Sequence, residues 1–234
     1  MTGARAPDGI RCIAFDFDGT LVESNPIKRD AYYAVFASVP GSAAVLEHVI
    51  RANPEADRHG IVHETRRALE DCGARSLPSA EELVRAYGRL CEEGVSQCAP
   101  VPGAVAALRA LAPCYPLYIA SATPEAPLRR VVARRGWAGF FRAVLGRPAT
   151  KTENLRTIAA REGIGPEALL LVGDGPPDRR AARTFGCRFA GFEAPAAELL
   201  AHPRLAVLAP LAREICARSP AWGAPRGDKP DAAG

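Results

Sequence analysis

Two carboxylates, Asp16 and Asp18, stand two residues apart where a short apolar run meets a glycine turn. That run, residues 10–15, has the length and composition of a buried strand. A second acidic turn, GDGPPD at residues 173–178, follows the apolar run of residues 169–172. In open α/β sheets ligands bind outside the carboxyl ends of the strands. The two turns therefore predict one crevice that brings three or four carboxylates together.

Carboxylates at such close range repel one another unless a cation neutralises them. Ligand sets made only of oxygen favour a hard ion such as Mg²⁺. One acidic turn alone is equally well explained as a polar surface turn. Two such turns at matched strand ends favour a binding site, and we predict that it holds Mg²⁺.

Two further polar residues follow apolar runs and are candidates to hold an anion. Ser121 ends the run of residues 115–120 beside the expected start of a helix, where N–H groups attract phosphate. The alternative is a simple helix cap. Lys151 begins a helix after the short run of residues 143–145. The chain has 30 Lys and Arg, of which only Lys28, Lys151 and Lys229 are Lys. A retained Lys suggests a need for a compact ammonium, against the alternative of a solvated surface residue.

Strand-like and helical patterns alternate along most of the chain. Strands are expected over residues 10–15, 115–120, 143–145, 169–172, 188–192 and 205–208. Helices are expected between them, over residues 104–111, 124–135, 152–162 and 178–185. This alternation predicts an α/β fold whose parallel sheet is covered by helices on both faces.

One long segment breaks the alternation. Residues 22–99 contain no convincing strand, and helical patterns cover residues 26–38, 42–52, 57–71 and 79–95. We expect an all-helical cap domain over residues 22–99, inserted into a discontinuous core of residues 1–21 and 100–217. Residues 218–234, rich in Pro, Gly and Ala, are expected to be disordered.

The order and spacing of these motifs resemble the haloacid dehalogenase-like superfamily. The four motifs are DFDGT at residues 16–20, Ser121, Lys151, and Gly173-Asp174 with Asp178. The insert resembles the helical cap of the subfamily that includes phosphoglycolate phosphatase and β-phosphoglucomutase. The resemblance covers roughly residues 10–192 and implies a Rossmann-like core.

The resemblance also implies a role for each acidic residue. Asp16 would be the nucleophile that forms an aspartyl-phosphate. Asp18 would protonate the leaving oxygen and then deprotonate the attacking water. Mg²⁺ would be bound by the Asp16 carboxylate, the Asp18 backbone carbonyl and Asp174. Asp178 would support Lys151 or a metal-bound water.

Phosphate-binding groups are implied in the same way. They are the side chains of Ser121 and Lys151, with further groups at Gly19, Thr20 and Ala122, including backbone N–H donors. The sequence departs from the family at Gly175, where Ser or Thr is usual.

The reaction type is indicated by Asp18. Haloacid dehalogenases of the superfamily lack a carboxylate at this position, because a halide leaves without a proton whereas an alkoxide needs one. We therefore expect a Mg²⁺-dependent phosphatase of a small phosphorylated metabolite. Two alternatives stay open: a phosphomutase of the β-phosphoglucomutase type, and a non-catalytic scaffold of the same fold.

In the expected cap, Lys28 and Arg58 are candidates for substrate contact, against the alternative of solvated surface residues.

The net charge is +4, but the sequence lacks the dense basic stripe with interleaved aromatic residues that would predict nucleic-acid binding. No apolar run approaches the ~18–20 residues that cross a bilayer. The first residues have no apolar segment typical of a signal peptide. Seven cysteines without a CxxC motif indicate a reducing, cytoplasmic setting. Either a monomer or a homodimer is compatible with the sequence.

Overall fold

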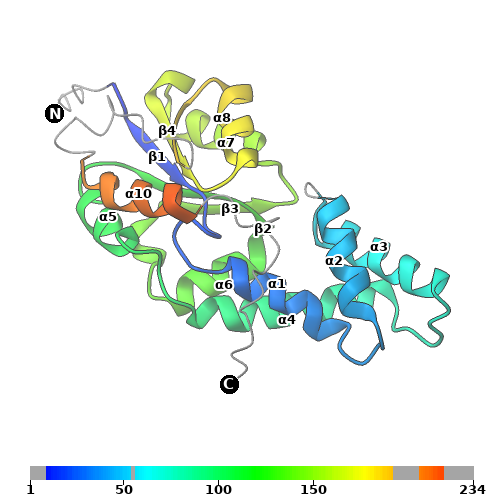
Figure 1. The fold of residues 1–234 in the computed structure, drawn as a ribbon. Coiled ribbons are helices and arrows are strands. Elements are labelled where there is room, and N and C mark those ends of the chain that lie inside the picture. The colour runs from blue at the N-terminus through cyan, green and yellow to red at the C-terminus, as the bar shows by residue number, and fades with distance from the viewer. Residues whose placement is uncertain (1–8, 54–55, 192–205, 219–234) are drawn as a thin grey trace. The chain divides into compact units, whose positions relative to one another are not determined.

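A computed structural model describes residues 9–53, 56–191 and 206–218 of the chain. Five strands form one parallel sheet in the order β3-β2-β1-β4-β5 (Figure 1). The strands are β1 (Cys12–Phe15), β2 (Leu117–Pro124), β3 (Ala143–Arg147), β4 (Leu169–Gly173) and β5 (Arg188–Gly191). Parallel neighbours need helical crossovers, and these cover both faces of the sheet. The predicted α/β class is thereby confirmed.

The sequence of the central strand β1 is apolar throughout because both faces of the strand are buried. Cys12 and Ala14 belong to the core on one face of the sheet, and Ile13 and Phe15 belong to the core on the other. All four residues are fully buried. Side chains along a strand point alternately to the two faces, so a strand covered on both faces must be continuously apolar.

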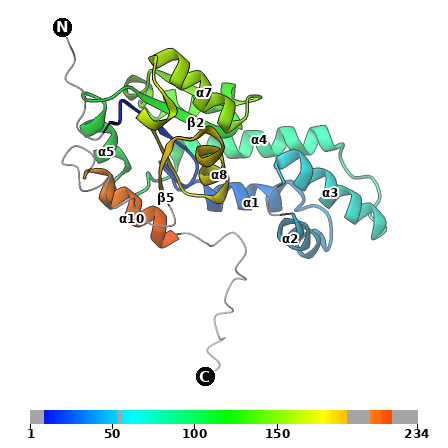
Figure 2. The same cartoon turned by 90° about the horizontal axis from the view of Figure 1, so that it is seen from above.

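The two faces are covered by different helices (Figures 1 and 2). On one face lie α7 (Lys151–Glu162) and α8 (Pro176–Phe185), which pack against each other. On the other face lie α5 (Ala104–Leu111), α6 (Glu125–Arg134) and α10 (Leu208–Arg218). Helices α5 and α10 lie side by side in both views. Short 3₁₀ turns, Ala138–Phe140 and Pro166–Ala168, precede β3 and β4.

The chain between β1 and α5 is mainly helical in its described residues. It forms α1 (Asn25–Val35), α2 (Ser42–Ala52), α3 (Arg58–Asp71) and α4 (Ala80–Gln97). The chain divides into two compact units, of which one is Tyr32–Tyr87 and the other contains the sheet. Within Tyr32–Tyr87, α2 packs on α3, and the rings of Tyr32 and Tyr87 stack with centroids 4.2 Å apart. The cap boundaries at residues 22 and 99 stay a prediction, and this compact unit lies inside them.

One predicted strand was wrong. Leu208 begins helix α10, and the sheet has five strands among the described residues, while Leu205 lies outside them. A short apolar run fits a strand and a buried helix equally well. The spacing decides for a helix, because Leu208, Leu211 and Ile215 are all buried at helical intervals. Of residues 218–234, which were predicted to be disordered, Arg218 ends α10 and the rest lie outside the described residues. No helix in the described part of the chain is both long and apolar enough to span a membrane.

Candidate active site

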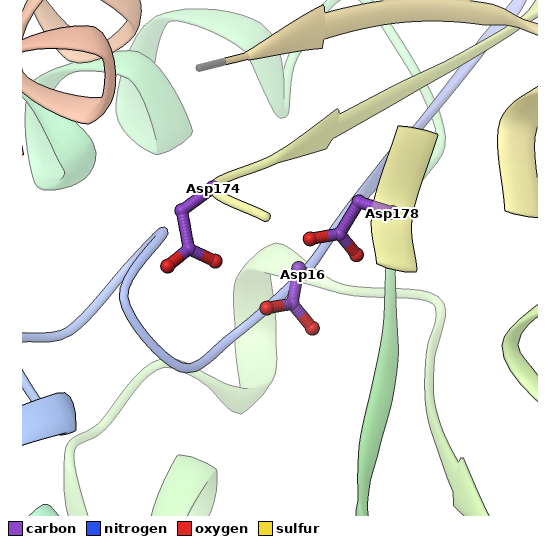
Figure 3. A group of neighbouring side chains, drawn as sticks. All are labelled: Asp16, Asp174 and Asp178. Carbon is purple, nitrogen blue, oxygen red and sulfur yellow. The ribbon is translucent and has the colours of Figure 1, made fainter. Parts of the chain in front are cut away.

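Three aspartates converge at the carboxyl edge of the sheet. β1 and β4 are neighbours, and the N–H of Asp16 donates to the Val172 carbonyl at 2.8 Å. Asp174 directly follows β4, and Asp178 lies in the first turn of α8. One carboxylate oxygen from each of Asp16, Asp174 and Asp178 lies within 4.8 Å of the others. Figure 3 shows the three side chains pointing toward one another.

Lys151 supplies the positive charge of this cluster. Its Nζ donates to Oδ1 of Asp16 at 2.7 Å and also pairs with Asp178. Lys151 is the first residue of α7, whose start is defined by a capping box between Thr150 and Glu153. The Glu153 carboxylate accepts the Thr150 N–H at 2.7 Å, which satisfies a helix-end donor. The local sequence thus determines where the helix begins and where the ammonium is presented.

The acidic cluster has more negative charge than Lys151 can balance. Burial raises the pKa of Asp16 well above its ordinary value, Lys151 opposes this, and Asp178 and Asp174 add to it. Burial and the nearby Asp178 raise the pKa of Asp174 to about 6, although Asn25 and Thr20 work in the opposite direction. Burial disfavours the charge on Lys151, but Asp16 and Asp178 outweigh it and raise its pKa above the ordinary value. A bound cation would relieve this excess negative charge.

The donors around Asp174 fit a metal site. The hydroxyl of Thr20 donates to Oδ1 of Asp174 at 3.2 Å, and the amide of Asn25 donates to Oδ2 at 3.4 Å. Gly19 has φ +75, and a Cβ there would lie 2.1 Å from Oδ2 of Asp174. Glycine is therefore required for both the turn and the close approach of this carboxylate. Three carboxylates oriented by hydrogen bonds form a donor set suited to Mg²⁺.

Asp18 has different surroundings, although it is only two residues from Asp16. Its Oδ1 accepts from Ser24 at 2.7 Å. Its Oδ2 accepts from Thr123 at 2.7 Å and lies 2.5 Å from Nζ of Lys28. Burial would raise the pKa of Asp18, but the charge of Lys28 and these hydrogen bonds lower it below its ordinary value. The pKa values of the two carboxylates of the first motif are thus shifted in opposite directions, because their surroundings differ.

The expected phosphate-binding residues Gly19, Thr20, Ser121 and Ala122 lie after β1 and near the end of β2, and their role stays a prediction. Ser121 is buried near the end of β2, and its hydroxyl accepts the N–H of Thr123 at 3.1 Å. Ala122 is exposed beside it. The N–H of Gly19 donates to the Val22 carbonyl at 2.9 Å, so closing the turn already uses this donor. The Thr20 hydroxyl likewise donates to Asp174 at 3.2 Å.

The two candidate substrate residues are placed differently. Lys28 belongs to the unit that contains the sheet and contacts Asp18 and Thr123. Arg58 belongs to Tyr32–Tyr87, where its guanidinium carbon lies 5.9 Å from the centroid of the Tyr87 ring.

Sequence reasoning did not assign the groups that orient the motif acids. These are Ser24, Asn25 and Thr123. Their contacts join residues that are up to 149 positions apart, and no local pattern marks such pairs.

Comparison with known proteins agrees with this geometry. The family described as haloacid dehalogenase-like hydrolase matches residues 10–186. The chain belongs to this hydrolase family. It is 27% identical to phosphoglycolate phosphatase of Escherichia coli K12, over 79% of this chain and 81% of that protein.

Solved structures of the family have the same fold. A predicted phosphoglycolate phosphatase from Haemophilus somnus 129PT has a TM-score of 0.64 and 22% identity, over 81% of this chain and 91% of that one. The L-2-haloacid dehalogenase of Xanthobacter autotrophicus has a TM-score of 0.57 and 20% identity, over 86% and 87% of the two chains. Because phosphatase and dehalogenase share the fold, the reaction must be argued from the site.

Proposed function

We propose that this protein is a Mg²⁺-dependent phosphatase that hydrolyses a small phosphorylated metabolite through an aspartyl-phosphate. The observation that carries the proposal is the contrast between the two carboxylates of the first motif. Asp16 lies in the acidic cluster against Lys151, and Asp18 lies apart from it among Lys28, Ser24 and Thr123. This contrast supports attack on phosphorus by Asp16 and proton transfer by Asp18.

The reaction follows from these positions. A carboxylate oxygen of Asp16 attacks phosphorus, the bond to the leaving oxygen breaks, and Asp18 gives that oxygen a proton. Water then attacks the aspartyl-phosphate, Asp18 takes a proton from it, and inorganic phosphate leaves with Asp16 regenerated. Lys151 balances the charge on the transferring group. Mg²⁺ held by Asp16, Asp174 and the Asp18 carbonyl would supply the charge neutralisation that lets an anionic nucleophile approach an anionic phosphate.

The presence of Asp18 supports phosphoryl transfer over dehalogenation, since only an oxygen leaving group needs its proton. The curated relatives named phosphoglycolate phosphatase make phosphorylated hydroxy acids the first substrates to test, beginning with 2-phosphoglycolate.

Phosphate release from 4-nitrophenyl phosphate and from 2-phosphoglycolate tests the proposal. We expect turnover with Mg²⁺, none with EDTA, and none in Asp16→Asn. Turnover that persists in EDTA or in Asp16→Asn would falsify the mechanism. Isomer formation from hexose 1-phosphates without free phosphate would replace the phosphatase with a phosphomutase.

The covalent step has a separate test in Asp18→Asn. This variant lacks the base that activates water, so the phosphoenzyme formed from an aryl phosphate should accumulate. Acid quenching and mass spectrometry should find one phosphoryl group on the peptide that contains Asp16. An unmodified peptide during turnover would exclude the aspartyl-phosphate.

A further inference from the structure

The carboxylate of Asp18 receives three side-chain donors. Oδ2 receives both Lys28 Nζ, at 2.5 Å, and the Thr123 hydroxyl, at 2.7 Å. Lys28 Nζ also donates to Thr123 Oγ1 at 3.1 Å, which closes a triangle of three side chains. On the other oxygen, Ser24 donates to Oδ1 at 2.7 Å. These donors come from α1, from the residue just before it, and from the end of β2.

Lys28 is presented to this carboxylate by a well-defined helical turn. The N–H of Lys28 donates to the carbonyl of Ser24, the residue before α1, at 2.9 Å, so Lys28 lies in the first turn of that helix. The adjacent Ile27 packs against the main core, where a Cβ on Gly94 would lie 2.6 Å from its side chain. The Lys28 side chain is only 20% exposed. Its ammonium is thus held beside Asp18 by packing as well as by charge.

The number of hydrogen bonds that Asp18 can accept shows which of its oxygens still has an acceptor position available. A carboxylate offers about four lone pairs, two on each oxygen. Lys28 and Thr123 occupy both positions on Oδ2, and Ser24 occupies one on Oδ1. One acceptor position on Oδ1 remains in this set of contacts. When Oδ1 carries a proton, Oδ2 is still an acceptor for both of its donors, so these contacts can persist through both halves of the reaction.

We propose that Lys28 is a positioning residue for proton transfer: with Thr123 it engages Oδ2 of Asp18 and thereby makes Oδ1 the atom that exchanges the proton. This inference rests on the proposed phosphatase function and deepens it. It replaces the substrate contact that the sequence suggested for Lys28 with a contact to the acid itself. Misplacing a catalytic group by about 1 Å costs on the order of 10²-fold in rate.

The leaving group distinguishes positioning from a merely structural ion pair. Expulsion of an alkoxide needs the proton of Asp18, whereas 4-nitrophenolate leaves with little need for one. The ratio kcat/KM reports only steps up to the first irreversible one, which here is loss of the leaving alcohol. Comparing kcat/KM for ethyl phosphate and 4-nitrophenyl phosphate therefore isolates the step in which Asp18 acts as an acid.

We expect Lys28→Met to lower kcat/KM for ethyl phosphate at least about tenfold more than for 4-nitrophenyl phosphate. Thr123→Val, which removes the second donor to Oδ2, should shift the ratio in the same direction. Lys28→Arg should restore part of the loss, because it keeps a cationic donor. Arg161→Met, which removes an exposed cation of α7, is the matched control and should leave the ratio unchanged.

Each other outcome overturns the proposal. Equal losses on both substrates, with a lower Tm, would show that Lys28 only stabilises the fold. An unchanged ratio in soluble Lys28→Met would show that Asp18 needs no such support. A rise in KM only for substrates whose leaving alcohol carries a negative charge, such as 2-phosphoglycolate, would show that Lys28 binds the substrate instead. If the wild-type protein hydrolyses neither ethyl phosphate nor 4-nitrophenyl phosphate with Mg²⁺, the proposed phosphatase function is wrong. That result is distinct from the outcomes above, which overturn only the role of Lys28.

Discussion

Lys151 Nζ lies 2.7 Å from Oδ1 of Asp16, which joins the first residue of α7 to the end of β1 across 135 positions of sequence. The side chains of both residues are almost completely buried. The same ammonium pairs with Asp178 in α8. One cation thus connects the two helices on this face of the sheet to its central strand.

Removing this cation should affect both stability and activity. Lys151→Met leaves Asp16 and Asp178 buried without their partner, which typically costs about 3–5 kcal/mol. Urea unfolding in EDTA measures the loss, and kcat should fall by about 10²-fold or more because a transition-state charge loses its partner. Mg²⁺ should restore part of the stability but not the activity. Full activity in Lys151→Met would contradict the assigned role.

The stability of the metal-free protein should decrease with rising pH. Because the pKa of Asp174 is raised to about 6 from an ordinary 3.8, the folded state holds its proton more tightly than the unfolded chain. That stabilisation is fully present below the ordinary pKa and is lost as pH rises through about 6. The pKa of Asp18 lies below its ordinary value, so the contribution of Asp18 to stability changes only at lower pH.

Thermal unfolding in EDTA from about pH 4.5 to pH 7.5 measures this dependence. Asp174→Asn should weaken this dependence, and the raised pKa of Asp16 should account for the part that remains. Saturating Mg²⁺ at the higher pH should restore the Tm, because the ion binds the ionised carboxylates. A Tm that rises steadily over this window in EDTA would contradict the arrangement.

Asn25 should contribute to metal affinity through Asp174. Its amide orients Oδ2, so Asn25→Ala should weaken Mg²⁺ binding by about tenfold, as loss of an outer hydrogen bond to a ligand typically does. Titration calorimetry measures the affinity without substrate. Asn53→Ala removes an amide that donates to Val49 in α2 and serves as the matched control. Equal Mg²⁺ affinity in both variants would remove Asn25 from the site.

Arg135 should stabilise the unit that contains the sheet. Its Nη1 donates to the carbonyls of Val95 at 2.9 Å and Cys98 at 2.8 Å, and its guanidinium lies over the Trp137 ring. Arg135→Met leaves these carbonyls at the end of α4 without this donor and should lower the free energy of unfolding by about 2 kcal/mol.

A second arginine provides the control for this measurement. Arg130 forms an ion pair with Glu92 and is 54% exposed, so Arg130→Met should cost below about 1 kcal/mol. Similar losses in the two variants, measured by urea unfolding, would show that the carbonyl contacts of Arg135 add nothing.

The motif residues could be identified from the sequence because each stands beside a local signal. Asp16 and Asp174 follow apolar runs whose length and composition suit buried strands, and Lys151 lies within a capping box. Strand ends in such a sheet meet at one edge. The α/β class, the helical insert and the convergence of the acids were therefore accessible from local pattern and chain order. The run at residues 205–208 was misread because its length suits a strand as well as a helix.

Tertiary structure alone decided which side chains surround the acids. Lys28 and Thr123 meet at Asp18 although 95 positions separate them, and Asn25 reaches Asp174 across 149. Such pairs depend on how a helix start and distant strand ends are packed, which no short window of sequence encodes. The different surroundings of Asp16 and Asp18 arise in the same way. The residue types set the chemistry that is available, and the packing determines that Asp16 shares its lysine with Asp178 beside other acids whereas Asp18 pairs with Lys28 apart from that cluster.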